Sequence, residues 1–286
     1  MASVMQILDS VDPLQTEIAR WKRQGHTVGL VPTMGDLHEG HLSLVRQARE
    51  KADRLVVSLF VNPLQFGPGE DFDRYPRRLD ADSSLLGKER VDILFVPGND
   101  AIYPQGTQAV RQVSAGDLAS ILCGVGRPGH FDGVATVVKR LFEIVQPDLA
   151  VFGQKDYQQL LVIRRLVAGA GLEVDILGGP TFREADGLAM STRNRYLNAK
   201  ERAVAPQLYA ELQAAKALMQ AGGLTHEQIV ERSIDNLTAV GFRPVYFELR
   251  RATNLSVPGE TDRDLVLLTA AYLGETRLID NLLFSL

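Results

Sequence analysis

Short runs of apolar residues alternate with segments of helical periodicity along the first 180 residues of this chain. Each run is too short for a helix and stops at a turn residue, so we interpret it as a buried strand. The strands are expected at 27–31, 54–61, 91–96, 149–152 and 173–177. The helices are expected at 14–24, from about His41, from near Pro76, over 134–145 and from Tyr157. This alternation predicts an α/β fold with a doubly wound, Rossmann-like parallel sheet covered on both faces.

The pattern changes near residue 180, where strands and helices no longer alternate. Two helices are expected in succession, at about 199–221 and 225–240. Strand-like runs then follow at 245–249, 265–271 and 277–283. Helices followed by strands predict a smaller α+β domain. We therefore expect a first domain over 1–183 and a C-terminal domain over 184–286 that covers the active-site cleft.

The charge and the single cysteine limit what the chain can bind. The formal net charge is −4, which gives no general attraction to nucleic acid or to an anionic membrane. Cys123 is the one cysteine, so an internal disulfide framework and a cysteine-based zinc site are both excluded. A lone thiol is typical of a reducing compartment. We expect a cytoplasmic protein with no membrane span and no nucleic-acid partner.

Polar residues gather where three of the predicted strands end. Pro32–His41 follows the first strand, Asn62–Phe66 follows the second, and Gly153–Gln159 follows the fourth. In an open parallel sheet, ligands bind beyond the carboxyl ends of the strands. Three such loops rich in Gly, Asn, Gln, His and Lys therefore predict one composite binding site.

The two histidines of the first loop predict a phosphate site. His38 and His41 are three residues apart at the start of a helix, where free N–H groups and the helix dipole favour an anion. Gly35 and Gly40 let the backbone approach a ligand closely. A zinc-protease helix needs histidines four residues apart, so zinc is disfavoured. A pair of surface histidines near a helix cap is the plainer alternative. Lys155 offers a further charge to phosphate.

The segment Gly124–Gly129 matches the dinucleotide-binding pattern Gly-x-Gly-x-x-Gly letter for letter. That fingerprint needs a strand directly before it and a helix that opens within it. Here Pro128 lies inside the pattern, and the preceding residues 117–122 resemble a helix. We therefore reject an NAD site and interpret the segment as a loop in which Arg127 and His130 are available to anions.

Several segments together resemble the signature of the pantothenate synthetases, a family of His-x-x-His nucleotidyltransferases. They are Pro-Thr-Met-Gly-Asp-Leu-His-Glu-Gly-His at 32–41, Phe-Val-Asn-Pro-Leu-Gln-Phe at 60–66, Arg-Pro-Gly-His-Phe-Asp-Gly-Val at 127–134, Gly-Gln-Lys-Asp-Tyr-Gln-Gln at 153–159 and Asp-Gly-Leu-Ala-Met-Ser-Thr-Arg-Asn at 186–194. The resemblance extends along the whole chain with similar spacing.

The resemblance implies an enzyme that uses ATP and Mg²⁺ to join (R)-pantoate to β-alanine. Pantoate attacks the α-phosphate to give pantoyl adenylate and pyrophosphate, and β-alanine then displaces AMP to give pantothenate. Adenylation needs stabilised phosphate charge more than a protein nucleophile. The chain is rich in donors and cations at the predicted site and has no Ser-His-Asp constellation, which agrees with that chemistry. Relatives are usually homodimers, so we expect a homodimer.

The resemblance also assigns roles to individual residues. The catalytic group comprises His41 as the acid, with His38, Lys155 and Arg193. The ATP contacts are Met34, Gly35, Asp36, Leu37, His38, Glu39, Gly40, His41, Gly153, Gln154, Lys155, Asp156, Phe182, Met190, Ser191, Thr192 and Arg193. The substrate contacts are Gln65, Gln159, Asn62 and Thr33, and the candidate Mg²⁺ ligands are Asp80 and Asp82. In relatives a smaller aliphatic residue is common at position 182, and serine is more usual at position 192.

Two other functions remain open at this point. The first is another His-x-x-His nucleotidyltransferase that acts on a different small acid or phosphate, although such enzymes do not pair the histidines with a loop like Asn62–Gln65. The second is a nucleotide-binding regulator without chemistry. Intact His41, Lys155 and Gln159 disfavour a regulator, since a sensor does not need all three.

Overall fold

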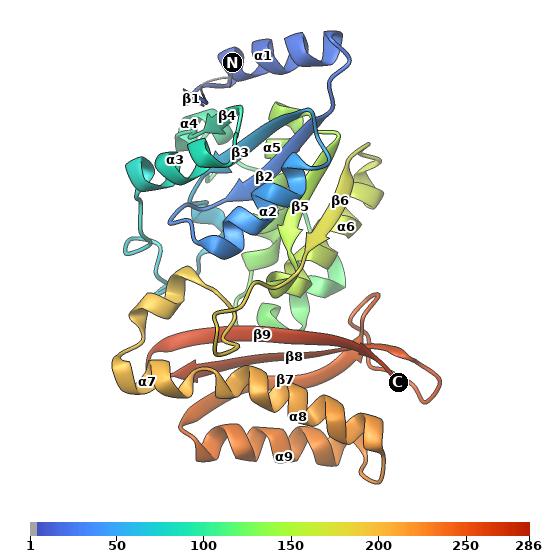
Figure 1. Ribbon diagram of the computed structural model, residues 1–286. Coiled ribbons are helices and arrows are strands. Elements are labelled where there is room, and N and C mark those ends of the chain that lie inside the picture. The colour runs from blue at the N-terminus through green and yellow to red at the C-terminus, as the bar shows by residue number, and fades with distance from the viewer. Residues whose placement is uncertain (1–4) are drawn as a thin grey trace. The chain divides into compact units, whose positions relative to one another are not determined.

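A computed structural model describes residues 5–286, which form two compact units. Unit 1 comprises the chain up to Gln154 together with Val162–Pro180, and unit 2 comprises Lys155–Leu161 and Thr181–Leu286 (Figure 1). The helix α6 (Tyr157–Ala170) therefore contributes residues to both units. The predicted domain ranges, 1–183 and 184–286, stay a prediction. No helix among residues 5–286 is long and apolar enough to cross a membrane.

Unit 1 is built on a six-stranded parallel sheet, as the alternation of strands and helices predicts. Its strands are β1 (Gln6–Leu8), β2 (Val28–Thr33), β3 (Arg54–Leu59), β4 (Ile93–Phe95), β5 (Leu149–Gly153) and β6 (Asp175–Gly179). They lie in the order β1-β4-β3-β2-β5-β6 with every pair parallel. After β2 the chain continues to β3, which pairs with one edge of β2, and the later strand β5 pairs with the other edge. The topological switch point, where such sheets bind ligands, is thus at the carboxyl ends of β2 and β5.

Helices connect these strands and bury an apolar face against them. They are α1 (Val11–Arg23), α2 (Glu39–Arg49), α3 (Leu79–Lys88), α4 (Asn99–Ile102), α5 (His130–Val145) and α6. Leu42, Val45 and Ala48 of α2 share a buried core with Val31 of β2 and Val57 of β3. α2 lies in front of the sheet in Figure 1, and α5 lies behind it. The packing of α2 on β2 keeps the loop between them at the switch point.

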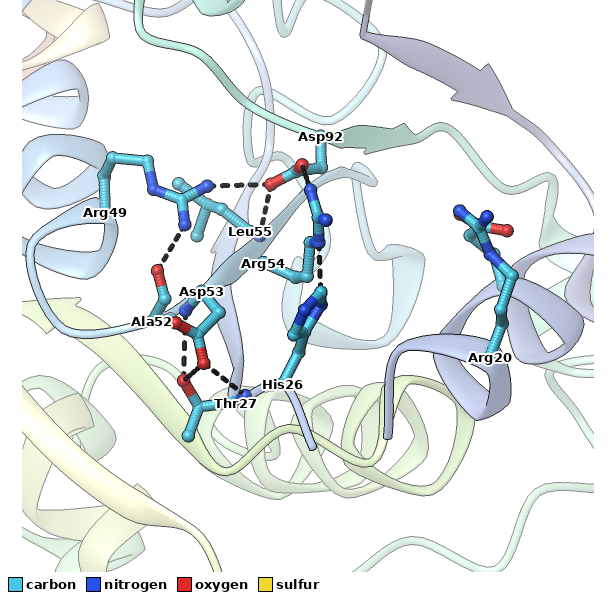
Figure 2. A network of polar contacts seen from close by, with 10 residues as sticks. Arg20, His26, Thr27, Arg49, Ala52, Asp53, Arg54, Leu55 and Asp92 are labelled. Atoms are coloured by element: carbon cyan, nitrogen blue, oxygen red, sulfur yellow. Dashed lines mark hydrogen bonds and ion pairs between the residues drawn. The ribbon is translucent and has the colours of Figure 1, made fainter. Parts of the chain in front are cut away.

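A hydrogen-bonded network ties together the amino ends of the strands (Figure 2). The Asp92 carboxylate accepts from Arg49 Nη1 at 2.7 Å, from Arg54 Nη1 at 2.9 Å and from the Leu55 N–H at 2.9 Å. The Asp53 carboxylate accepts from the backbone N–H and the hydroxyl of Thr27, each at 2.9 Å. These contacts join the end of α2 to the starts of β2, β3 and β4. They lie at the sheet edge opposite the loops that carry the predicted site.

Some predicted elements differ from the structure for local reasons. β1 was not predicted, because three residues are too few to show a periodicity. α3 begins at Leu79 and not near Pro76, and α2 begins at Glu39, two residues before His41. The predicted helix 117–122 consists of two 3-10 helices, Gly116–Ser120 and Leu122–Gly124. No strand lies between β4 and β5, so Gly124–Gly129 lacks the strand that the dinucleotide-binding fingerprint requires directly before it.

Unit 2 contains the predicted α+β arrangement. Its antiparallel sheet has the order β7 (Phe242–Arg251), β8 (Asp264–Leu273) and β9 (Thr276–Ser285). The helices α8 (Gln207–Ala221) and α9 (His226–Ala239) lie side by side on one face of it (Figure 1). The helix predicted over 199–221 is divided at Pro206 into α7 (Ala199–Val204) and α8, because proline has no N–H to donate to the preceding turn.

Candidate active site

The loop that links β2 to α2 carries both histidines and has an unusual backbone. Gly35 and Asp36 adopt positive φ angles of 87° and 52°. A positive φ is common for glycine and uncommon for aspartate, so contacts from the surrounding structure must hold Asp36 in place. The Thr33 hydroxyl begins this bend by donating to the Ser58 carbonyl at 3.0 Å and accepting from the Gly35 N–H at 3.3 Å.

His38 and His41 lie against each other at the amino terminus of α2. His38 is the N-cap residue, and the two rings stack with their centroids 4.0 Å apart. The His38 N–H donates to Nδ1 of His41 at 3.3 Å. An Nδ1 that accepts leaves the ring proton of neutral His41 on Nε2, where it can be donated to a ligand. Both side chains are half-buried beside the positive end of the helix dipole, which suits a phosphate.

Asp82 of α3, which is 46 residues from Asp36 in the sequence, forms hydrogen bonds to the same loop. Its Oδ2 accepts from the Asp36 N–H and its Oδ1 accepts from the Leu37 N–H, both at 2.8 Å. Only 2% of Asp82 is exposed, and this burial raises the pKa of its carboxyl, while the two N–H donors act in the opposite direction. The carboxylate thus faces the backbone of the histidine loop.

The pair Asp80 and Asp82 does not fit a shared Mg²⁺ site. Each oxygen of Asp82 is directed at a backbone N–H, as described above, and Asp80 is exposed two residues earlier on the same helix. Residues i and i+2 of a helix do not face each other. Among residues 5–286, no group of three or more His, Cys, Asp or Glu side chains is arranged to hold a metal ion.

Asn62 lies in the loop after β3, where it caps the 3-10 helix Pro63–Gln65, and all of its side-chain hydrogen bonds are made inside the protein. Its Oδ1 accepts from the Leu64 N–H at 3.2 Å and from the Tyr103 hydroxyl at 2.8 Å. Its Nδ2 donates to Gln65 Oε1 at 3.2 Å and to the Gly133 carbonyl at 3.1 Å. An amide side chain offers two donors and two acceptor lone pairs, and all four are engaged. Asn62 is 1% exposed, so it orients the loop and the Gln65 side chain.

Gln65 is held both at its side chain and at its backbone. Its Nε2 lies 3.0 Å from the sulfur of Met34, in the histidine loop. Its carbonyl accepts from Nδ1 of His130 at 2.7 Å and from Arg127 at 3.3 Å. The predicted Gln65 and Met34 side chains are therefore brought together, although they belong to different loops.

Arg127 forms a two-pronged ion pair with Glu70. Its Nε and Nη2 donate to the two carboxylate oxygens at 2.6 and 2.7 Å, and its Nη1 donates to His130 Nε2 at 2.9 Å. Burial raises the pKa of Glu70, but the hydrogen bonds and charge of Arg127 outweigh it and leave that pKa below its ordinary value. The expectation that Arg127 is available to anions is wrong, because its guanidinium is committed to Glu70.

Gly133 permits a close approach that sequence analysis did not identify as part of the site. A Cβ at this position of α5 would lie 2.2 Å from the carbonyl oxygen of Leu64 and 2.9 Å from the N–H nitrogen of Gln65. Only glycine allows α5 to touch the 3-10 helix Pro63–Gln65 in this way. The signal was present in the segment 127–134, where a glycine interrupts an apolar helical stripe.

Predicted ATP and substrate residues are found in both units. Gly153 ends β5 and Gln154 begins the 3-10 helix Gln154–Asp156; both belong to unit 1, in which β5 pairs with the strand that leads into the histidine loop. Lys155, Asp156 and Gln159 begin unit 2 and are half-buried. Within unit 2, Nδ2 of Asn281 on β9 donates to the Lys155 carbonyl at 2.9 Å, which orients the backbone of that lysine.

The remaining predicted ATP residues lie in the segment from Phe182 to Arg193. The Phe182 carbonyl accepts from the Met190 N–H at 2.9 Å, which closes a loop, and the Phe182 side chain is 38% exposed. Ser191 caps the 3-10 helix Thr192–Tyr196 by accepting from the Arg193 N–H at 3.3 Å. Thr192, where the resemblance leads us to expect serine, is buried.

An ion pair anchors the base of that loop to β9. Both oxygens of Asp280, whose side chain is 2% exposed, accept from the Arg183 guanidinium at 2.6 and 2.9 Å. The same guanidinium lies 3.4 Å from the centre of the Tyr209 ring. This anchor was not predictable from the sequence, because its partners are almost 100 residues apart.

Comparisons with known proteins agree along the chain. A family described as pantoate–β-alanine ligase matches residues 6–283. The pantothenate synthetase of Shewanella oneidensis is 50% identical over 276 residues, which covers 96% of this chain and 98% of that protein. The crystal structure of pantothenate synthetase from Thermus thermophilus aligns with a TM-score of 0.90 at 46% identity, covering 97% of this chain and 99% of that one. A Francisella tularensis pantoate–β-alanine ligase, crystallised with "beta-gamma ATP" and β-alanine, aligns with a TM-score of 0.80 at 32% identity, covering 98% and 97%.

Proposed function

The chain belongs to the pantoate–β-alanine ligase family, and from this premise we propose how its own residues perform the reaction. It condenses pantoate with β-alanine at the expense of ATP, through pantoyl adenylate, and releases AMP and pyrophosphate. One observation carries the proposal: two stacked histidines begin a helix at the switch point of the sheet, and Gln65, which Asn62 holds in place, contacts Met34 of the same loop.

In the first step, a pantoate carboxylate oxygen attacks the α-phosphate and pyrophosphate leaves. His41 donates from Nε2 to the phosphate oxygens on which charge accumulates, because its Nδ1 already accepts the His38 N–H. His38 and the N–H groups of the first turn of α2 add positive potential. Lys155 and Arg193 neutralise the remaining phosphate charge.

In the second step, the β-alanine amine attacks the acyl carbon of the adenylate and AMP leaves. This step needs close and correct placement of the two reactants more than any protein acid or base. Gln65 and Gln159 bind the pantoyl group, and Thr33 shapes the turn below it. Asn62 acts through Gln65, because its own donors and acceptors are taken up by the protein.

The ATP contacts carried over from the family motifs remain our proposal for this chain. They comprise Met34–His41, Gly153–Asp156, Phe182 and Met190–Arg193. The backbone of Phe182 contacts the adenine, and the hydroxyl of Thr192 takes the place of serine. We propose that Mg²⁺ accompanies ATP, but no step is assigned to Asp80 or Asp82, since their arrangement does not fit a shared site. We also propose a cytoplasmic homodimer, which the single cysteine and the family resemblance support.

The function is tested by following AMP formation with the purified protein. AMP is expected only when ATP, pantoate and β-alanine are all present, and pantothenate should form in equal amount. Equal AMP formation without β-alanine would contradict an amide-forming ligase. Turnover of a nicotinate or phosphopantetheine substrate in place of pantoate would support a different His-x-x-His nucleotidyltransferase.

A further inference from the structure

We propose that Asp82 is a positioning residue that acts as a built-in anion and fixes the conformation of the histidine loop. The inference rests on the proposed function, since it concerns the loop that carries His38 and His41. Asp82 touches neither histidine side chain in any described contact. It acts through the backbone that leads into them.

The loop presents its backbone N–H groups as a cradle for negative charge. Successive residues of opposite or left-handed backbone conformation form concave arrangements of N–H groups that bind anions. The positive φ angles of Gly35 and Asp36 create such a turn, and the N–H groups of Asp36 and Leu37 converge on one carboxylate. Asp82 therefore occupies the place that an external anion would otherwise take.

The hydrogen bonds of Asp82 involve the two residues that directly precede His38. The N–H groups of residues 36 and 37 are bound by Asp82, and the next N–H, that of His38, is bound by Nδ1 of His41. Three consecutive N–H groups thus have defined partners inside the protein. A shift of the first two would move the third, and with it the hydrogen bond that places the His41 proton on Nε2.

The place of Asp82 on its own helix favours a fixed carboxylate. It lies in the first turn of α3, where the helix dipole favours negative charge. The carboxylate lies close to the Gly35 backbone, because a Cβ added to Gly35 would lie only 3.2 Å from Asp82 Oδ2. Hydrogen bonds between a charged group and backbone N–H groups are stronger than those between neutral groups, and their loss is correspondingly costly.

Enzyme kinetics distinguish this role from that of a metal ligand. For Asp82→Asn we expect kcat to fall by about tenfold or more, because a misplaced catalytic group lowers turnover steeply. The Mg²⁺ concentration for half-maximal activity should stay within about twofold of the wild-type value. The matched control is Ser84→Ala, an exposed position on the same helix, which should retain the wild-type kcat. A Mg²⁺ requirement raised about tenfold, with kcat restored at saturating Mg²⁺, would overturn the proposal.

Amide hydrogen exchange tests the same contact without activity and without metal. In the wild-type protein, the amides of Asp36 and Leu37 should exchange slowly, and Asp82→Asn should speed their exchange by about tenfold or more. Fast exchange of both amides in the wild-type protein would overturn the proposal, even if the variant does not fold. A wild-type protein that lacks ligase activity but protects both amides would contradict the proposed function and leave the anchoring role supported.

Discussion

Asn62 illustrates how a residue can belong to a site without touching the ligand. Its position after a buried strand predicts a substrate contact, and an amide is well suited to a carboxylate or an amine. In the folded chain its two donors and two acceptors are all engaged by the protein, among them the Tyr103 hydroxyl and Gln65 Oε1. Burial also raises the pKa of Tyr103, which further favours the protonated hydroxyl that donates to Asn62. The role of such a residue depends on its neighbours.

The role of His41 leads to a prediction for turnover. His41→Ala should lower kcat by about 100-fold or more, because it removes a donor aimed at developing phosphate charge. The far-UV circular dichroism spectrum should not change, since the side chain is half-buried at a helix start. His226→Ala, at the start of α9 in unit 2, is the matched control and should keep wild-type turnover. A kcat within about threefold of wild type for His41→Ala would contradict the assigned role.

The Glu70–Arg127 ion pair leads to a prediction for the pH dependence of stability. Because the pKa of Glu70 is lower in the folded protein, its ionised form stabilises the fold above the unfolded pKa of about 4.3. That contribution is lost as pH falls through the folded pKa. The difference in unfolding free energy between wild type and Glu70→Gln should therefore be constant from pH 7 to about 5 and shrink below about pH 4.

Urea unfolding at several pH values measures this difference. The exposed substitution Glu275→Gln serves as the control and should give a difference near zero throughout. A difference for Glu70→Gln that grows on acidification would show that the pair does not stabilise the fold in this way.

At the scale of elements, the contact between α5 and the 3-10 helix Pro63–Gln65 depends on one glycine. Gly133→Ala should destabilise the protein by roughly 1–3 kcal/mol, since the new Cβ would collide with the Leu64 backbone. It should also raise the KM for pantoate, because Gln65 is displaced. Gly169→Ala, a helical glycine with nothing within 4 Å of its Cβ, should instead stabilise by about 0.5–1 kcal/mol. Thermal unfolding and steady-state kinetics measure both variants. Equal changes in stability for Gly133→Ala and Gly169→Ala would contradict the close contact at Gly133.

Elements were predictable from sequence where one local cause determines them. The runs that became β2, β3 and β5 are mostly apolar because both faces of the sheet are covered, and their short length between turn residues identifies them as strands. The histidine spacing predicted that two rings share one helical turn. The conformation of the loop before them was not predictable, because Asp82 holds it from 46 residues away. The ion pair of Arg183 with Asp280 was also not predictable, because its two residues are far apart in the sequence.

At the scale of the whole molecule, the chain charge and the family membership bear on assembly. The net charge of −4 and the acidic pI of about 5.8 give the chain no general attraction to polyanions. Light scattering on the purified protein should give about twice the chain mass of 31.4 kDa, as expected for the proposed homodimer. A mass near 31.4 kDa at micromolar concentration would contradict the dimer.

The network around Asp92 stabilises one end of the sheet, and the loops proposed to bind the substrates lie at the other end (Figure 2). Together with the Thr27–Asp53 hydrogen bonds, it joins the amino ends of β2, β3 and β4, whereas the ligand loops follow carboxyl ends of strands in the same sheet. Substitutions at Arg49, Arg54 or Asp92 therefore change how firmly the sheet is held without altering any group proposed to meet a substrate. A lineage adapting to a new temperature can adjust this edge while its catalytic loops keep their sequence. The same edge is a natural starting point for engineering a more heat-resistant enzyme.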